Sequence, residues 1–443
     1  MKVELSRHYQ YKHLVLTVIP SIIMFLVTSV YSIVDGLFVS NYAGTTPFAA
    51  ISLIWPGIML IGSLGIMIGT GGAALVAKTK GEGNLQRANE IFSMLVKLTL
   101  IGGILLSTLM FMFMRPLSQV LGAEGQMLSD CVTYGRILCI SFTPFLLHLM
   151  FNSFFMAAER PALGTKLSVV CGVTNMILDF LFIAIFHWGI AGAAIATAIG
   201  QAIGGLYPLY YFASQRNKSS LRIVPSRFDW KSIRQSCLNG SSEYVGNIAL
   251  SIVSICYNVQ LIHYIGENGV ATYGILMYVA YIYAAVFIGY NVGVSPIISY
   301  HYGAGNKQEL HSLLVKSLVI LSVSGTALTL MAELLSRQTS AIFVGYDPEL
   351  LDLTTRAFRI YMVSFMICGI NLFVSAFFTA LNNGIVSALA AFTRTLIFEV
   401  GAVFLLPLII GIDGIWWSVD LADLLALIMS IILLAHFRRR YGY

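Results

Sequence analysis

The second half of this 443-residue chain repeats the first half, with a shift of 222 residues, along a sequence made almost entirely of apolar segments. The register is marked by the pairs Tyr42 and Tyr264, Gly71 and Gly293, Gly81 and Gly303, and Asn84 and Asn306. One inserted residue then brings Arg136 onto Arg359 and Phe154 onto Phe377. Two joined copies of a helical bundle, with a site between them, are the usual build of secondary transporters.

Composition places the chain in a membrane, because 58% of its residues are hydrophobic and only 10% are charged. Each apolar segment reaches the roughly 20 residues that a helix needs to cross the hydrocarbon core. We therefore expect an all-α polytopic membrane protein with twelve transmembrane helices in two pseudo-symmetric six-helix bundles. The expected spans are 14–40, 47–77, 91–114, 130–156, 163–186, 190–214, 237–264, 269–299, 309–335, 350–381, 384–410 and 413–437.

The same pattern predicts three parts: an N-lobe at 1–214, a basic cytoplasmic linker at 215–236 and a C-lobe at 237–443. The linker contains the long polar break from Arg216 to Arg234 and is expected to be amphipathic. Lys and Arg collect in the loops of one side, which predicts that both termini are cytoplasmic. The formal charge of +6 then reflects topology and contact with membrane lipid rather than nucleic-acid binding. We expect a multi-pass protein of the cell (plasma or inner) membrane, with no cleaved signal peptide.

Motifs for cofactors, metals and catalysis are not apparent. The six cysteines and eight histidines are dispersed without ligand-like spacing, so no structural metal or disulfide framework is expected. The glycines at 69, 71 and 72 lack the Lys and Ser or Thr of a phosphate-binding loop. There is no nucleophile-base cluster that would suggest an enzyme. Transport would then depend on a gradient of H+ or Na+ rather than on nucleotide hydrolysis.

Polar residues on three N-lobe helices form a candidate cation-coupling site. Tyr31 precedes Asp35 by one turn on the first helix, and Asn175 precedes Asp179 by one turn on the fifth. Thr197 lies on the sixth helix at the same expected depth, in the outer half of the membrane. Acids inside a bilayer tend to line a pathway, and two of them at one depth can bind a cation or share a proton. The alternative is that each acid only caps a polar contact between helices.

The second repeat does not copy this constellation, because Asp35 maps to Tyr257 and Thr197 maps to Val419. The sequence therefore predicts the cation site in one lobe. Glu243 falls near the expected cytoplasmic start of the seventh helix. The candidates for a substrate cavity are Met150, Asn152, Gln201, Glu399, Asp420 and Asp423.

Two basic residues are expected to neutralise C-lobe acids. Arg359 lies at a depth suited to pairing with Asp420 or Asp423, and Arg394 could reach Glu399. In the N-lobe, Pro20 interrupts the first helix about four turns before Asp35 and is a candidate hinge, because an interior proline removes a backbone hydrogen bond. A static kink is the alternative.

Several motifs together resemble the multidrug and toxic compound extrusion (MATE) transporters. They are DGLFV at 35–39, GEGN at 81–84, NMILD at 175–179, GIAGAAIAT at 189–197 and SYHYGAGN at 299–306. The resemblance implies two six-helix lobes around a central cavity that exchange Na+ or H+ for bulky, often cationic, organic compounds. It also implies an N-lobe cation site at Tyr31, Asp35, Asn175, Asp179 and Thr197, and a bending first helix at Pro20.

On this basis we expect a monomeric bacterial multidrug efflux antiporter. Small organic cations would be its substrates, and it would use no cofactor beyond the coupling ion. The alternative is a flippase of lipid-linked oligosaccharide or lipid from the same wider superfamily. Anionic cargo of that kind would favour a cavity lined by Arg and Lys, whereas several of the deep residues here are acids.

Overall fold

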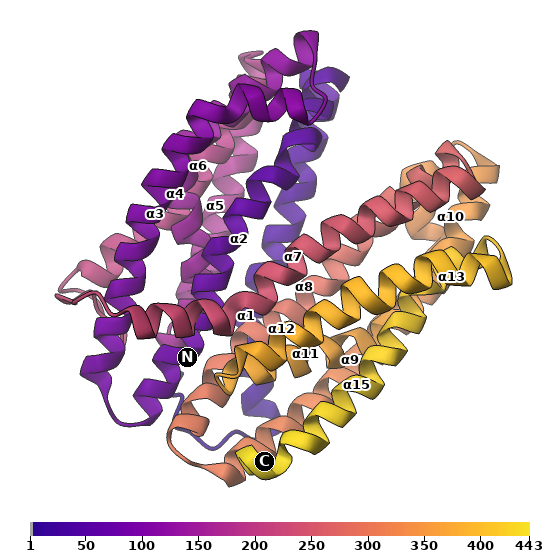
Figure 1. Ribbon diagram of the computed structural model, residues 1–443. Coiled ribbons are helices and arrows are strands. Elements are labelled where there is room, and N and C mark those ends of the chain that lie inside the picture. The colour runs from indigo at the N-terminus through magenta and orange to yellow at the C-terminus, as the bar shows by residue number, and fades with distance from the viewer. Residues whose placement is uncertain (1–2) are drawn as a thin grey trace.

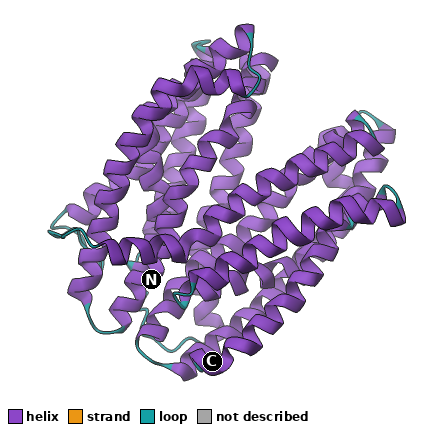
Figure 2. Cartoon of the chain, viewed as in Figure 1, coloured by secondary structure: helices purple, strands orange, loops and turns teal. Residues whose placement is uncertain are grey.

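The computed structural model describes residues 3–443, and all regular secondary structure in that range is helical (Figure 2). Twelve helical spans in this range are long and apolar enough to cross a membrane, which confirms the twelve expected from the sequence. The N-terminal elements are α1 (Tyr11–Phe38), η1 (Val39–Ala43), α2 (Thr45–Gly81), α3 (Leu85–Val120), α4 (Gly125–Ala157), α5 (Pro161–Asp179), η2 (Phe180–Ile185) and α6 (Gly189–Ala213). They are followed by α7 (Trp230–Tyr264), α8 (Glu267–Gly303), α9 (Lys307–Val344), α10 (Pro348–Tyr361), η3 (Met362–Ser364), α11 (Phe365–Ala380), α12 (Gly384–Phe392), η4 (Thr393–Glu399), α13 (Val400–Ile410), α14 (Asp413–Trp416) and α15 (Ser418–Tyr441).

Helix α7 begins seven residues earlier than the sequence pattern indicated. Asp229 caps it, and its side chain accepts a hydrogen bond from the Lys231 amide. The end of the expected linker is therefore helical, and residues 214–229 before it contain no helix or strand. A second consequence concerns Glu243, which lies thirteen residues inside α7 instead of near its start.

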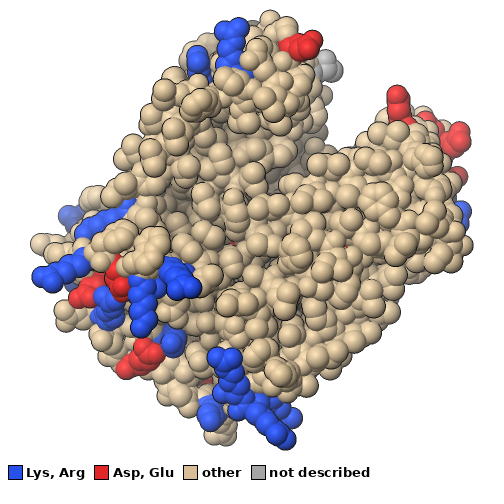
Figure 3. All heavy atoms as spheres, in the orientation of Figure 1, with Lys and Arg blue, Asp and Glu red and all other residues tan. Residues whose placement is uncertain are grey.

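The helices form two groups that meet at one end and diverge at the other (Figure 1). We call α1 to α6 the N-lobe and α7 to α15 the C-lobe. The space-filling view shows the surface hollowed between the two lobes at the diverging end, and we call this hollow the cleft (Figure 3). Lys and Arg side chains gather mostly at the opposite end, over the linker and near both chain termini (Figure 3).

Close backbone contacts join the lobes where α2 crosses α7. A Cβ atom at Gly71 would lie 2.0 Å from the Ser236 carbonyl oxygen, and one at Gly240 would lie 1.9 Å from that of Met67. Neither contact leaves room for a side chain, so only glycine permits this approach. The contacts form a seam that holds the lobes together below the cleft.

The crossing of α2 with α8 uses the same device at two repeat-equivalent positions. A Cβ atom at Gly81 would lie 2.0 Å from the Tyr300 carbonyl oxygen, and one at Gly303 would lie 2.1 Å from that of Lys78. The sequence repeat is therefore visible in the packing, since two equivalent glycines support each other across the lobe interface.

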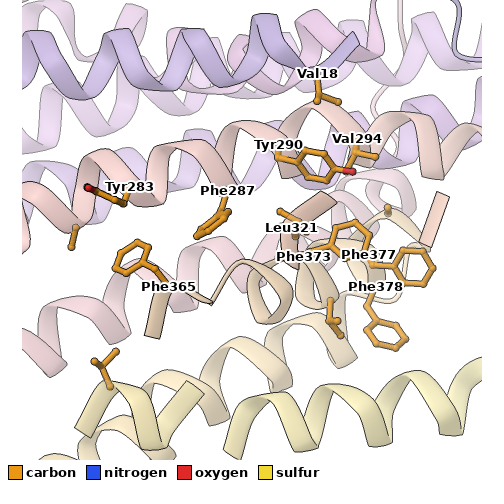
Figure 4. Packing of buried hydrophobic residues seen from close by; sticks show 14 of the residues in the cluster. Val18, Tyr283, Phe287, Tyr290, Val294, Leu321, Phe365, Phe373, Phe377 and Phe378 are labelled. Atoms are coloured by element: carbon orange, nitrogen blue, oxygen red, sulfur yellow. The ribbon is translucent and has the colours of Figure 1, made fainter. Parts of the chain in front are cut away.

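An aromatic core fills the C-lobe (Figure 4). Phe287 of α8 stacks on Phe365 of α11, with ring centroids 6.2 Å apart, and both side chains are buried. Val18 of α1 belongs to the same buried cluster, although α1 is an N-lobe helix. The first helix is thus packed against the C-lobe in its lower half, and its upper half remains with the N-lobe.

The segment before α1 fastens the two lobes at the end where the termini lie. The Tyr9 amide donates to Glu309 Oε1 of α9 at 2.9 Å, and His8 contacts the other oxygen of that carboxylate. Lys316 donates to the Tyr9 carbonyl oxygen, and Leu5 is fully buried in the C-lobe cluster. These contacts close the bottom of the molecule.

Candidate functional site

The two N-lobe acids lie where their helices change winding. Asp35 comes one turn before α1 passes into the π-helical turn η1, and Asp179 is the last residue of α5 before the π-helical turn η2. The two π turns contact each other. Turns of this kind are frequent at functional sites, and they rotate the side chains on either side relative to a regular helix.

Asp35 and Asp179 lie close together across α1 and α5, near enough for each carboxyl group to act on the other. Both oxygens of Asp179 and Oδ1 of Asp35 are buried without a hydrogen-bond partner among the described residues. Two ionised carboxylates offer only acceptors and repel each other, and a proton or a cation held between them removes that repulsion. Asp179 is completely inaccessible to solvent. The pair can therefore hold a proton or an oxygen-seeking cation such as Na+.

The other expected residues of this site surround the acid pair. Tyr31 packs on α5 at Gly172, where a Cβ atom would lie 3.0 Å from the tyrosine ring, and it is close enough to Asp35 to be affected by its charge. The Oδ1 atom of Asn175 and the Oγ1 atom of Thr197 are buried without a hydrogen-bond partner in the described part of the chain. Unpartnered oxygens around two acids are suited to ligating a cation.

Tyr134 of α4 is a further member of this cluster that the sequence reasoning missed. It is 1% exposed, lies beside Thr197, and is close enough to Asp35 and Asp179 for both charges to act on its phenol. Its sequence signal was weak because tyrosine is common at membrane interfaces. Its depth on the fourth helix, matching that of Thr197, was the available clue.

Pro20 lies within α1, which continues as a helix on both sides of it. Its carbonyl oxygen accepts a hydrogen bond of 2.6 Å from Thr165 Oγ1 of α5. The candidate hinge is therefore attached to α5, the helix that carries Asp179. If α1 bends at Pro20, the part of α1 beyond the proline moves while Pro20 itself stays bound to α5.

The pairing expected for Arg359 with Asp420 or Asp423 is wrong, because another base holds Asp423. Arg394 of η4 donates from Nε to Asp423 Oδ1 at 2.5 Å and also contacts Cys368, and it is close enough to Glu399 for its charge to act on that acid. Arg359 donates instead to Ser336 Oγ at 2.9 Å, on the exposed side of α10. The rotation of each helix about its own axis decides which partner Arg394 and Arg359 reach, since depth in the membrane alone does not fix the direction in which a side chain points.

A sequence profile of the MatE family matches the chain twice, over residues 20–181 and 244–405. This chain belongs to the MatE family. The two matches fall on the two halves and agree with the internal repeat. Relatives of this MatE chain include the multidrug export protein MepA of Staphylococcus haemolyticus, which is 23% identical over 95% of this chain and 92% of its own length.

Solved structures share the fold of this MatE chain closely. A MATE multidrug resistance transporter in an outward-facing conformation superposes with a TM-score of 0.92 at 21% identity, covering 98% of this chain and 97% of the other. A MATE structure described as straight gives a TM-score of 0.91, with the same identity and the same coverage. These likenesses establish the two-lobed fold.

The structure places three of the expected substrate-cavity residues of this MatE chain within helix packing. Met150 is fully buried and accepts a hydrogen bond from Thr99 at its sulfur, and Gln201 accepts one of 2.9 Å from Ser141. Asp423 is occupied by Arg394. These side chains already have partners inside the lobes, and their place on the wall of a substrate cavity stays a prediction.

The other candidates in this MatE chain have free polar atoms. Asn152 is half-buried, and its Oδ1 has no partner among the described residues. Glu399 and Asp420 lie in the C-lobe, and both oxygens of Asp420 are buried without a donor in residues 3–443. Glu243 is half-buried one turn beyond Gly240, which places it next to the seam under the cleft.

Proposed function

We propose that this chain is a secondary antiporter that exports bulky, often cationic organic compounds in exchange for H+ or Na+. The Asp35 and Asp179 pair carries the proposal, because it is an acid pair inside a membrane lobe with no basic partner in residues 3–443. The multidrug export names of the staphylococcal relatives support the class of substrate. We further propose that the protein acts as a monomer in a bacterial cell membrane.

Charge repulsion supplies the driving step of this mechanism. Two unit charges 4 Å apart repel by about 4 kcal/mol at the effective dielectric near a protein surface. A proton or a sodium ion bound between Asp35 and Asp179 removes that repulsion. When the ion leaves, either the two carboxyl groups separate or a cationic substrate compensates their charge.

Separation of the acids would be transmitted through α1. The carbonyl oxygen of Pro20 is held by Thr165, whereas the upper part of α1 ends in the π turn η1. The tethered proline is then the fixed point about which the upper half of α1 bends toward or away from α5. Such bending changes the shape of the cleft wall, so ion binding and substrate binding become coupled.

The distribution of Lys and Arg indicates which end of the molecule faces the cytoplasm. Cytoplasmic ends of membrane proteins carry the excess of Lys and Arg, and here these residues gather mostly at the closed end with both termini (Figure 3). The cleft then opens to the outside, as in the neighbour described as outward-facing. Protons or sodium ions would enter the N-lobe from the cleft, and Glu243 beside the seam would attract the cationic part of a substrate.

The test is accumulation of a fluorescent organic cation such as ethidium in cells that express the wild type or Asp35→Asn, with the proton and sodium gradients collapsed separately. We expect wild-type cells to extrude the dye, the variant to fail while it remains folded in the membrane, and one collapsed gradient to stop extrusion. That gradient identifies the ion. Extrusion in none of the conditions would contradict the proposal and redirect the search to lipid or metabolite cargo.

A further inference from the structure

An open pocket of about 470 Å³ lies between α9, α10 and α14 of the C-lobe. Figure 1 shows α10 at the diverging end of this lobe, away from the end where most Lys and Arg side chains gather. The charged and aromatic residues that line the pocket are Arg337, Asp352, Arg356, Arg359, Asp413 and Trp417. The ion and substrate steps described above make no use of them.

The length of α9 places this pocket at the level of lipid headgroups. Helix α9 begins at Lys307, whose side chain lies against Gly442 beside the C-terminus at the closed end. Arg337 follows thirty residues later, which is about 45 Å along a helix that rises 1.5 Å per residue. A bilayer is about 40–45 Å thick when its headgroups are included. Arg337 therefore reaches the headgroups of the leaflet at the diverging end.

The pocket contains two arginines with unused hydrogen-bond donors. Arg337 approaches Asp352 at 3.8 Å, which is longer than a hydrogen bond, and has no other polar contact in residues 3–443. Arg359 donates through Nε to Ser336, and its approach to Glu333 at 3.9 Å uses the same nitrogen. The terminal nitrogens of both guanidinium groups are thus left for another acceptor. A guanidinium presents its donors in a fork that matches the oxygens of a phosphate.

The two acids of the pocket differ in how far they are neutralised. Asp413 forms a close ion pair with Arg356. Asp352 is 74% exposed, and the long approach of Arg337 is its one polar contact within the described part of the chain. Its carboxylate therefore keeps acceptor capacity for a cationic group. Free donors and a free acceptor lie side by side, which fits a zwitterion better than a simple anion.

An apolar stripe leads from the pocket along α9 toward the middle of the membrane. Leu334 and Leu330 precede Arg337 by three and seven residues, so all three lie on one face of the helix. Their side chains are 77% and 58% exposed, and Val323 continues the same face. Trp417 at the pocket is also exposed, as is typical of tryptophan at a membrane interface. A charged pocket above an exposed apolar stripe complements a phospholipid.

We propose that this pocket binds a zwitterionic phospholipid whose headgroup carries a phosphate and a primary ammonium group, as in phosphatidylethanolamine. The phosphate accepts hydrogen bonds from Arg337 and Arg359, the ammonium group donates to Asp352, and an acyl chain lies on Leu334 and Leu330. Because Arg337 belongs to α9 and the other two polar residues belong to α10, one lipid bridges the two helices. The lipid thereby stabilises the end of the C-lobe that borders the cleft.

The internal repeat provides a matched surface on the N-lobe. Arg115 and Arg136 are the repeat mates of the two arginines with free donors, and both are exposed. The guanidinium of Arg136 lies over the ring of Phe111 at 5.2 Å. Asp130 of α4 is buried and accepts a hydrogen bond of 2.9 Å from Gln126, so it offers no free carboxylate there. The N-lobe surface should therefore lack the preference for an ammonium group.

Native mass spectrometry of the delipidated protein in detergent tests the proposal by counting the lipids that it retains. Phosphatidylethanolamine would be compared with phosphatidylglycerol, which lacks the ammonium group, and with phosphatidylcholine, whose ammonium group has no N–H. We expect the wild type to bind phosphatidylethanolamine most tightly. The double variant Arg337→Gln and Arg359→Gln should lose about tenfold in affinity for it, because two charge-assisted contacts are removed. Asp352→Asn should lose the preference over phosphatidylglycerol.

The control is the double variant Arg115→Gln and Arg136→Gln, which should bind phosphatidylethanolamine as the wild type does. All the exchanged side chains are exposed, and equal unfolding temperatures without lipid would show that the variants are folded. Glycerophosphoethanolamine, which has the headgroup but no acyl chains, should not displace the lipid. Wild-type affinity in the Arg337 and Arg359 double variant would overturn the proposal, and so would tighter binding of phosphatidylglycerol by the wild type. Displacement by the soluble headgroup would refute the part assigned to the apolar stripe.

Discussion

Arg394 Nε lies 2.5 Å from Asp423 Oδ1, and this ion pair ties the π turn η4 to α15 inside the C-lobe. Asn371 of α11 donates to the same carboxylate at 3.1 Å and to the Asp423 carbonyl oxygen at 2.9 Å. Three helical segments are therefore joined at one buried point, far from the solvated ends of the lobe.

Removing only the base of this pair should destabilise the protein strongly. Arg394→Met leaves Asp423 buried and unpaired, which typically costs about 3–5 kcal/mol. The double variant with Asp423→Leu should recover most of that loss, because no charge is then left behind. Thermal unfolding in detergent measures both. As a matched control, Arg359→Met should cost less than about 1 kcal/mol, since that side chain is 57% exposed.

The N-lobe acids should act as one unit in transport. Asp35→Asn and Asp179→Asn are each expected to abolish gradient-driven uptake of an organic cation into proteoliposomes, because either change removes the shared ion-binding capacity. The double variant should be no worse than the single ones, since residues that act together are not additive. Substrate binding to the purified variants serves as the control for folding. Near-normal uptake by both single variants would contradict the shared role.

Tyr134→Phe should change the pH dependence of transport and leave the protein folded. The phenol of Tyr134 is buried beside Thr197 and close enough to both acids for their charges to act on it. Its loss removes a polar group from the place where the acids would hold an ion, so the dependence of the transport rate on pH should change. Initial rates across a pH series measure the shift. An unchanged profile would exclude Tyr134 from the site.

The glycine seam predicts a large effect from one methyl group. Gly240→Ala would place Cβ within 1.9 Å of the Met67 carbonyl oxygen, so α2 and α7 must move apart. Overpacking of this kind costs about 1–3 kcal/mol, and it should lower the unfolding temperature. Gly246→Ala, on the same helix with nothing within 4 Å of the added atom, is the control and should be neutral or slightly stabilising. Equal effects of the two substitutions would refute the seam.

The stability that Asp229 gives the protein by capping α7 should depend on pH in a defined direction. Hydrogen bonds from the Ser232 side chain and from backbone amides, together with the nearby Arg87, lower the pKa of Asp229. A lowered pKa in the folded state means that the carboxylate stabilises the fold above its unfolded pKa of about 4 and loses this effect as the pH falls below it. Asp229→Asn should thus be less stable than the wild type at pH 7, with the difference vanishing in acid. Unfolding at both pH values checks this.

Local properties of the chain were enough to predict much of this protein. Hydrophobic length gave the number of spans, and the repeat of Gly81 at Gly303 and of Arg136 at Arg359 indicated two equivalent bundles. The spacing of four between Tyr31 and Asp35 placed them on one face, because a helix turns by a fixed angle per residue. These features depend on the order of residues along one helix, which a sequence states directly.

Partners across helices were decided by tertiary structure. Depth suggested Arg359 for the C-lobe acids, yet Arg394 holds Asp423, because the rotation of a helix about its axis selects which side chains meet. Tyr134 joined the N-lobe acids for the same reason. Asp420 could be recognised as unpartnered only once every neighbour was in place. The sequence alone thus determined the helices and their acids, and packing of the lobes determined which charges are neutralised and which remain available for a proton.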